Sequence, residues 1–361
     1  MGRKVAIVHD WLIGMRGGEK VLESMLDIFA EADIFSLFFE PRHISEKIKS
    51  HNIFTSPLNK YAFIRNRHRH FLPLLPAAVE SFPLRDYHLV ISSSHCVAKG
   101  VIPGPDSLHI CYIHSPMRYI WDQYESYFGR LKGLKKSFIK RQVSKLRIWD
   151  VTSSARVDYF VANSNFVKQR VEKYYRRDAV VIHPPVDTDF FKPAESPRED
   201  YFLTVSALVP YKNNHLLVEA FNRLREPLVV VGAGPEEKRL KKMAGPNITF
   251  RKNVTAQELR ALYQQAAAFV YSGVEDFGIA FVEAQACGIP VIALKKGGVL
   301  DIVEDGRTGI LYEGEGIDNI ARAVKRLADF RFEPSILREN SLKFSPETFK
   351  IKIQTFIEGK Q

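Results

Sequence analysis

The chain has 361 residues, of which 45% are apolar and 26% are charged, with a formal net charge of +11. This composition excludes a largely disordered protein, and the length suits two domains better than one hydrophobic core. Residues 1–185 hold 28 Lys and Arg against 17 Asp and Glu, whereas residues 186–361 balance at 24 against 24. Because all the excess positive charge lies in the first half, an anionic partner of that half is expected: nucleic acid, lipid or a phosphorylated substrate.

Nothing in the sequence indicates export or a membrane span. Cys96, Cys111 and Cys287 lack the spacing of metal sites or disulfide frameworks, so reduced thiols in a cytoplasmic protein are expected. The N-terminus lacks the apolar stretch and cleavage site of a secretory signal. No run approaches the roughly 18 apolar residues that a spanning helix needs.

The first half alternates apolar strands with helices. Residues 4–8 predict a buried strand, followed by a glycine loop and a helix with apolar residues at helical spacing from Val21 to Phe29. Strands ending in small residues recur at 86–94, 107–116 and 158–167. Continuous apolar strands of this kind predict a parallel sheet that is covered on both faces.

The pattern restarts after a proline-rich stretch. Residues 180–200 contain four prolines and predict an interdomain linker. Strands are then expected at 201–208, 228–234, 267–273 and 290–296, with helices at 214–225 and 256–266. The predicted α/β architecture is therefore two three-layer domains, 1–185 and 186–344. A C-terminal helix over 345–361 has an apolar stripe that needs a surface, and it can pack back across the linker.

Two carboxylates flank a glycine in the stretch 274–294. Glu275 is expected in the loop at the carboxyl end of a strand, and Glu283 on the first or second turn of the next helix. Free backbone N–H groups between Gly278 and Ala280 can face an anion, while carboxylates accept hydrogen bonds from sugar hydroxyls. A nucleotide-sugar carries both phosphates and sugar hydroxyls, so it can bind the N–H groups and the carboxylates together. The alternative is an exposed loop acid and an unrelated helix-face acid.

Residues 275–312 resemble the E-x7-E segment of family-four glycosyltransferases, which are retaining enzymes of the two-domain GT-B fold. Residues 149–191 resemble the mannosyltransferase branch of O-antigen and surface-polysaccharide assembly, and the similarity covers nearly the whole chain. It implies two Rossmann-like domains facing each other across a cleft. It also implies transfer of a hexose, expected to be mannose from GDP-mannose, to a lipid-linked or polysaccharide acceptor.

The resemblance assigns donor-binding roles in the second domain. Glu283 corresponds to the acid that receives the ribose hydroxyls, and Glu275 to the acid near the transferred hexose. Lys212 corresponds to the lysine that neutralises the diphosphate. Backbone contacts to donor groups are implied at Gly232, Gly234, Phe277, Gly278, Ile279 and Ala280.

The sequence departs from the family pattern at Ala207. The family usually places an arginine there, five residues before the lysine, so half of the expected cationic clamp is absent. Either another basic residue substitutes or donor turnover is weakened, and a non-catalytic nucleotide-sugar binding subunit is the alternative function. No metal or other cofactor is expected, because the only Asp-x-Asp pair, at 187–189, lies in the predicted linker.

The resemblance also assigns residues of the first domain. Gly17 and Gly18 correspond to a loop whose backbone approaches the donor phosphates, and the alternative is a plain tight turn. His114 corresponds to a cleft histidine near the reacting sugar, although a lone histidine is more often structural. Weaker candidates on the acceptor side are Ser94, His95 and Lys99.

Two basic stretches account for the positive half. Residues 129–149 hold eight Lys and Arg and no acid, with Leu131, Leu134, Phe138, Val143 and Leu146 near one helical face. Residues 65–79 add basic, aromatic and apolar side chains. Both predict contact with an anionic membrane surface, hence a peripheral protein on the inner face of the cell membrane. The alternative is a solvated cationic face over ordinary core. No nucleic-acid motif is present, so nucleic acid is not an expected partner.

Overall fold

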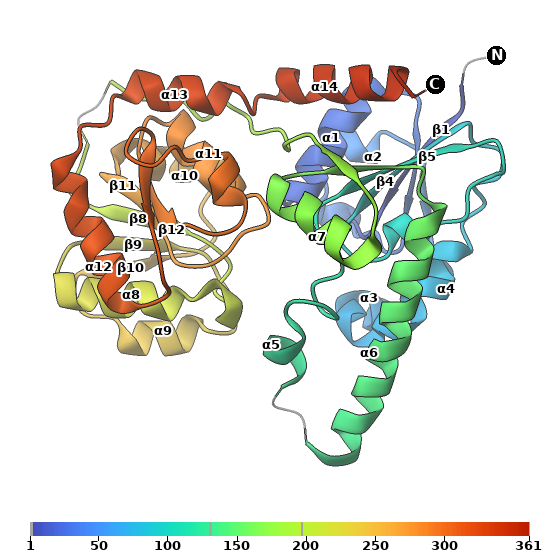
Figure 1. Cartoon of the computed structure of the whole chain (residues 1–361), viewed down its shortest axis with the longest axis horizontal. Coiled ribbons are helices and arrows are strands. Elements are labelled where there is room, and N and C mark those ends of the chain that lie inside the picture. The colour runs from blue at the N-terminus through green and yellow to red at the C-terminus, as the bar shows by residue number, and fades with distance from the viewer. Residues whose placement is uncertain (1–2, 130–131, 196–197, 361) are drawn as a thin grey trace. The chain divides into compact units, whose positions relative to one another are not determined.

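The computed structural model describes residues 3–129, 132–195 and 198–360. Its contacts divide the chain into two compact units (Figure 1). Unit 1 comprises the residues up to Pro185 together with the C-terminal segment from Phe349, and unit 2 runs from Val186 to Thr348.

Unit 1 is built on a seven-stranded sheet of order β3-β2-β1-β4-β5-β6-β7, in which all neighbouring strands are parallel. The prediction of a parallel sheet is confirmed. Its strands are β1 (Val5–His9), β2 (Asp33–Ser36), β3 (Ile53–Thr55), β4 (Leu89–Ser94), β5 (Leu108–Ile113), β6 (Tyr159–Ala162) and β7 (Ala179–Val181). Its α-helices are α1 (Gly17–Ile28), α2 (Glu46–Lys49), α3 (Ala62–Asn66), α4 (Leu75–Glu80), α5 (Tyr124–Phe128), α6 (Gly133–Ser153), α7 (Asn165–Tyr175) and α14 (Pro346–Glu358).

Alternate strand residues of unit 1 pack into separate cores on the two faces of the sheet. Helices α1, α2 and α14 cover one face, and α4 and α6 cover the other together with the 3-10 segment His68–Leu74. Helix α14 buries Phe349, Ile353 and Ile357 against this first face, and the ring of Phe349 lies 5.8 Å from that of Tyr112. The apolar stripe of the C-terminal helix therefore packs on unit 1.

Unit 2 repeats the architecture with a six-stranded parallel sheet of order β10-β9-β8-β11-β12-β13. Its strands are β8 (Phe202–Val205), β9 (Leu228–Val231), β10 (Ile248–Arg251), β11 (Ala268–Tyr271), β12 (Val291–Leu294) and β13 (Gly309–Tyr312). Its α-helices are α8 (Asn214–Leu224), α9 (Glu237–Met243), α10 (Ala256–Gln265), α11 (Ile279–Ala286), α12 (Ile317–Lys325) and α13 (Pro334–Leu342). Helices α8, α9 and α12 cover one face, and α10 and α11 cover the other.

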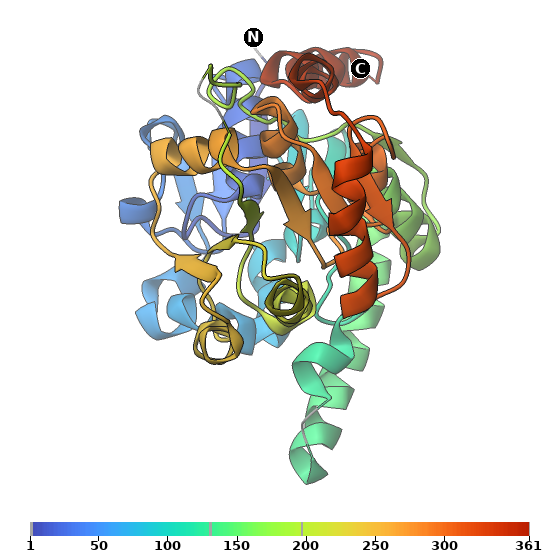
Figure 2. The ribbon, with the colours of Figure 1, turned by 90° about the vertical axis from the view of Figure 1, so that its left-hand side faces the viewer.

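Helix α6 differs from the single apolar face predicted for residues 129–149. Val143 and Leu146 are buried, whereas Leu134 and Phe138 are 92% and 61% exposed. The predicted stripe therefore contributes to the core only in the second half of the helix, and the first half extends away from the sheet (Figures 1 and 2). Residues 130–131 of the predicted stretch lie outside the described residues.

Across the described part of the chain, no helix combines the length and the apolar character needed to cross a bilayer.

Candidate functional site

Each sheet has one point where the strand order reverses direction. In unit 1 this point lies between β1 and β4, and in unit 2 between β8 and β11. Open parallel α/β sheets bind ligands outside the carboxyl ends of the strands at such a point, because the loops there diverge to opposite faces. Polar residues predicted from the sequence lie at both points.

In unit 2, Glu275 follows β11 and is held by two neighbours. Its Oε1 accepts hydrogen bonds from the Lys212 ammonium and the Tyr271 hydroxyl. Lys212 ends the 3-10 segment after β8, and its side chain is 9% exposed against 20% for Glu275. No described residue donates to Oε2 of Glu275, so this oxygen remains able to accept a hydrogen bond from a ligand.

Glu283 lies on the second turn of α11 and is held in a similar way. Its Oε2 accepts a hydrogen bond of 2.9 Å from the Tyr263 hydroxyl. Burial raises the pKa of the Glu283 carboxyl to about 7, although the Tyr263 hydrogen bond opposes the shift. The carboxyl is therefore poised to change its ionisation near neutral pH, and a ligand hydroxyl that donates to it favours the ionised form.

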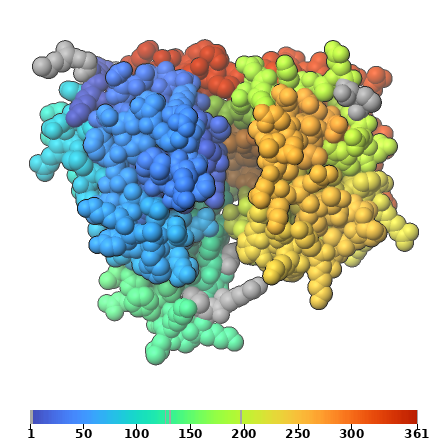
Figure 3. All heavy atoms as spheres, turned by 180° about the vertical axis from the view of Figure 1, so that it is seen from behind, coloured from blue at the N-terminus to red at the C-terminus, as the bar shows by residue number. Residues whose placement is uncertain are grey.

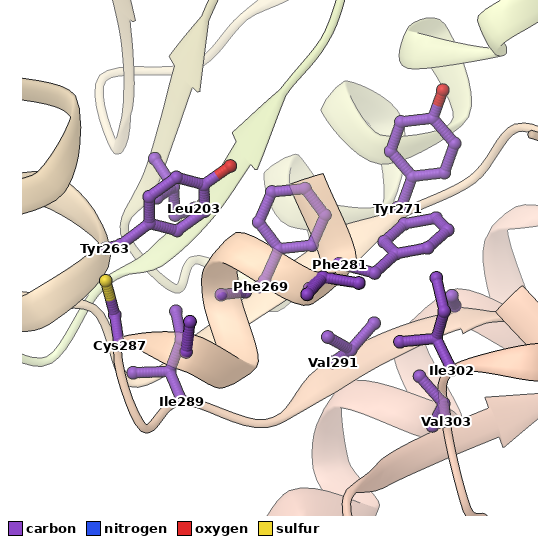
Figure 4. Close-up of a cluster of buried hydrophobic side chains, with 14 of the residues drawn as sticks. Leu203, Tyr263, Phe269, Tyr271, Phe281, Cys287, Ile289, Val291, Ile302 and Val303 are labelled. Atoms are coloured by element: carbon purple, nitrogen blue, oxygen red, sulfur yellow. The ribbon is translucent and has the colours of Figure 1, made fainter. Parts of the chain in front are cut away.

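The two tyrosines belong to one aromatic core. Tyr263 and Tyr271 lie on either side of Phe269, with ring centroids 5.9 and 6.3 Å from that ring (Figure 4). Both rings are buried, and each hydroxyl ends at one carboxylate. The core beneath β11 and α11 thus fixes both acids, which explains why two carboxylates adjoin an apolar strand.

The helix α11 begins next to Glu275. Its N-cap is Gly278 at φ +101°, a left-handed conformation that favours glycine, and an added Cβ would lie 2.3 Å from the Phe281 ring. The N–H groups of Ile279 and Ala280 are in the first turn, where a helix offers no internal acceptor. They can therefore bind an anion, whereas the side chain of Phe277 is buried.

The glycines after β9 bring two loops together. A Cβ on Gly232 would lie 1.9 Å from the carbonyl oxygen of Ser206, and a Cβ on Gly234 would lie 2.3 Å from that of Leu208. Glycine is thus needed for the close approach of this loop to the segment that carries Ala207 and Lys212. Ala207 itself is exposed, and its position holds no cationic side chain.

In unit 1, His114 follows β5 and lies in a chain of polar groups. Its Nε2 is 2.8 Å from Ser93 Oγ, which in turn is 3.0 Å from Nδ1 of His9. Nε2 of His9 lies 3.7 Å from Oε1 of Glu19, on the first turn of α1. A Cβ on Gly18 would lie 3.2 Å from the His9 ring, so a glycine lets α1 approach the imidazoles.

His95 joins this cluster through Asp10. The His95 Nδ1 is 3.1 Å from Oδ2 of Asp10, and the ring centroids of His9 and His95 are 6.1 Å apart. Within the described ranges, no group of three or more His, Cys, Asp and Glu side chains has an arrangement that could hold a metal ion.

Two acceptor-side candidates have structural contacts. Lys99 is 1% exposed, and its ammonium donates to the Asp150 carbonyl and to Ser153 Oγ, each at 2.7 Å, and pairs with the Asp150 carboxylate at 3.0 Å. Ser94 is 1% exposed, and its Oγ accepts from the backbone N–H of Lys99. We therefore withdraw Lys99 as an acceptor contact, because its ammonium is buried against α6.

Several residues around these clusters were missed by sequence reasoning. His9 is the last residue of β1, Asp10 follows it, and Ser93 is the last residue but one of β4, so polar residues at strand ends were a usable signal. Tyr263 and Tyr271 gave no signal, since buried aromatics at these spacings are typical of ordinary core.

Two family models match the chain, one for each half. The model described as Glycosyltransferase Family 4 matches residues 16–190, and the model described as Glycosyl transferases group 1 matches residues 185–344. Together they include every site residue that the sequence predicts.

Curated relatives match over part of their length. The GDP-mannose-dependent alpha-(1-6)-phosphatidylinositol monomannoside mannosyltransferase of Mycolicibacterium smegmatis is 32% identical over 213 residues, covering 50% of this chain and 55% of the relative. The D-inositol 3-phosphate glycosyltransferase of Streptomyces bingchenggensis is 33% identical over 216 residues, covering 50% and 47%. The chain thus spans about half the length of these relatives.

Solved structures match over the whole chain. The lipopolysaccharide outer core galactosyltransferase WaaB in its apo form has a TM-score of 0.70 at 16% identity, covering 99% of this chain and 100% of that one. Anabaena HepE in complex with UDP has a TM-score of 0.71 at 16% identity, with the same coverage. At these identities the likeness establishes a shared fold.

Proposed function

Because the chain belongs to the family-4 glycosyltransferases and has the GT-B fold, we propose that it transfers a hexose from a nucleoside diphosphate donor to a lipid-linked or polysaccharide acceptor. The observation that carries this proposal is the pair Glu275 and Glu283. Each acid has one oxygen fixed by a core tyrosine, and they stand beside a lysine and a helix N-terminus at a sheet switch point. Sugar hydroxyls and a diphosphate are the ligand groups that this combination suits.

The proposed donor is GDP-mannose. Support comes from the name of the M. smegmatis relative, which specifies GDP-mannose, although Anabaena HepE was solved with UDP. In this proposal Glu283 receives the ribose hydroxyls, Glu275 lies near the hexose, and Lys212 with the α11 N-terminus faces the diphosphate. Charge stabilisation by these groups would serve a retaining transfer without a metal ion.

Thermal unfolding in the presence of nucleotide-sugars tests the donor. GDP-mannose at about 100 times its dissociation constant should stabilise the protein by roughly 2.7 kcal/mol, and UDP-sugars at equal concentration by less. Release of GDP in the presence of a polyprenyl-diphosphate glycan should follow. A panel in which no nucleotide-sugar raises the melting temperature would refute donor binding.

The same assay separates the second candidate, a non-catalytic nucleotide-sugar binding subunit. Ala207 favours this alternative, because the position holds no cation to share the diphosphate charge with Lys212. Stabilisation by GDP-mannose without GDP release, across lipid-linked acceptors, would establish binding without turnover.

An anionic membrane is the proposed location of the acceptor. The exposed Leu134 and Phe138 lie among basic residues on the first half of α6, and Tyr61 and Phe63 are 61% and 59% exposed at α3. Figure 3 shows the light-blue surface around α3 adjoining the green surface of α6. The apolar side chains can enter the interface while the basic groups meet anionic headgroups.

Exchanging four lysines at α6 for glutamine should weaken binding to vesicles containing phosphatidylglycerol. Each basic residue near such a surface contributes about 1 kcal/mol, so the partition coefficient should fall at least about tenfold in a sedimentation assay. The exchanged residues are Lys132, Lys135, Lys136 and Lys140. A control variant with the same net charge exchanges four exposed lysines elsewhere: Lys238, Lys242, Lys325 and Lys352. If both variants lose vesicle binding equally, the effect is one of net charge and not of the position of the lysines on α6.

A further inference from the structure

His114 is connected to a buried carboxylate through two intermediate side chains. We propose that Glu19, His9 and Ser93 act as positioning residues that keep the proton of the His114 ring on Nε2, which presents Nδ1 as a hydrogen-bond acceptor to a substrate hydroxyl. The inference rests on the proposed function for the identity of that hydroxyl. The direction of the hydrogen bonds follows from the protein alone.

The Ser93 hydroxyl has a single proton and two imidazole neighbours. It can donate to Nδ1 of His9 and accept from Nε2–H of His114, or it can donate to His114 and accept from His9. The first direction leaves Nδ1 of His114 as an acceptor, and the second makes it a donor. Which direction is adopted depends on the other end of this series of hydrogen-bonded side chains, where Glu19 lies.

Glu19 selects the first direction. Its Oε2 accepts from the backbone N–H of Arg16 at 2.9 Å, which fixes the carboxylate at the start of α1, and its Oε1 is 3.7 Å from Nε2 of His9. That nitrogen is buried and has no hydrogen-bond partner among the described residues. In a neutral ring, an N–H directed at a carboxylate is attracted to it and a lone pair is repelled. His9 therefore has its proton on Nε2, and its Nδ1 accepts from Ser93.

The ionisation of the two ends agrees with this direction. Burial opposes ionisation of Glu19, but the electrostatic attraction between its carboxylate and the nearby His9 ring outweighs burial, so the pKa of Glu19 is lowered. Burial, followed by the charges of His95 and His9, lowers the pKa of His114 to about 3. A neutral imidazole of such low basicity accepts a hydrogen bond but takes up a proton poorly, so His114 orients a hydroxyl rather than removing its proton.

A substrate-free measurement tests the hydrogen-bond direction. Nitrogen-15 NMR of histidine-labelled protein should show His114 protonated on Nε2 at pH 8, with the resonances assigned by their loss in His114→Asn. A resting His114 with its proton on Nδ1 overturns the proposal. Because no nucleotide-sugar is needed, this result stands whether or not the chain proves to be a transferase.

Turnover tests the positioning role. Ser93→Ala should lower kcat by about 10- to 100-fold with a small change in the KM for the donor, since a misplaced contact group affects the reacting geometry. Ser93→Thr, which keeps the hydroxyl, should recover part of the loss. Ser92→Ala is the matched control, because Ser92 makes an equivalent buried bond of 2.9 Å to His109. Equal kcat losses in Ser93→Ala and Ser92→Ala would overturn the assignment.

Discussion

Replacing Glu283 by Gln should weaken nucleotide binding about 10- to 100-fold, since hydrogen bonds to charged groups contribute about 1.5–3 kcal/mol each. The same change should make the protein more stable at pH 8. Both results follow from one half-buried carboxyl on α11, which is held by a single hydroxyl, that of Tyr263. An acid that improves stability when it is removed is retained for binding.

The sign of the stability effect follows from the raised pKa of Glu283. The folded protein holds a proton on this group up to about pH 7, whereas the unfolded chain releases it near the ordinary value of 4.5. Stability therefore falls as pH rises between these values, by up to about 3 kcal/mol at 1.36 kcal/mol per pKa unit. Glu283→Gln should raise the melting temperature at pH 8 and leave it nearly unchanged at pH 4.5.

Calorimetry links the two effects. Nucleotide binding should ionise Glu283 and release close to half a proton at pH 7, detected by titration in buffers of different ionisation enthalpy. Glu283→Gln should release none. Tyr263→Phe is the matched variant, because it keeps the acid but removes the hydrogen bond that lowers its pKa, so it should shift tight binding to higher pH. A Glu283→Gln protein that binds nucleotide like the parent would remove this acid from the site.

The arrangement of strands and helices was largely predictable because it depends on local periodicity. Apolar runs such as residues 228–231 and 291–294 form strands where expected. The sequence did not predict five short strands, β2, β3, β7, β10 and β13. Residues of β3, β7 and β10 are exposed, so these three strands lack the continuous buried run of the predicted ones. Helix α6 was harder, because only tertiary neighbours decide that Val143 is buried and Phe138 is not.

The two acids of the candidate site could be predicted from the sequence, but the residues that hydrogen-bond to them could not. Glu275 and Glu283 stand eight residues apart on one strand–helix connection, so local sequence brings them together. Tyr263 reaches Glu283 from a neighbouring helix, a contact without a local signature. Lys99 was misread for the same reason, since its partner Asp150 is distant in the sequence.

The two switch points share one physical design. In unit 2, Glu275 and Glu283 each have one oxygen held by the hydroxyl of a different buried tyrosine. In unit 1, the hydroxyl of a buried serine holds one ring nitrogen of His114. In each case the second polar atom of the group is left without a partner among the described residues. Fixing one atom lowers the entropy lost when a ligand binds the other, which is how preorganisation contributes to affinity.

Asp10→Asn should destabilise unit 1 by about 3–5 kcal/mol, the cost typical of breaking a buried charge arrangement. The Asp10 side chain is completely buried, and its two oxygens accept four backbone N–H groups at 2.6–2.9 Å, those of residues 95–98. An amide in the same place must direct its NH2 group at two of these donors. The loop that carries His95 would lose its anchor.

Urea unfolding followed by tryptophan fluorescence measures this loss selectively, because Trp11, Trp121 and Trp149 all lie in unit 1. Burial opposes ionisation of Asp10, yet the His95 charge and the backbone N–H groups keep its pKa below the ordinary value of 3.8. Its contribution to stability is therefore present above that pH and is lost as pH falls, so the variant should differ from the parent most at neutral pH. Asp106→Asn, at an exposed acid of the same unit, is the control. A loss below about 1 kcal/mol would mean that the loop relaxes to satisfy the amide, and the anchoring role would then fail.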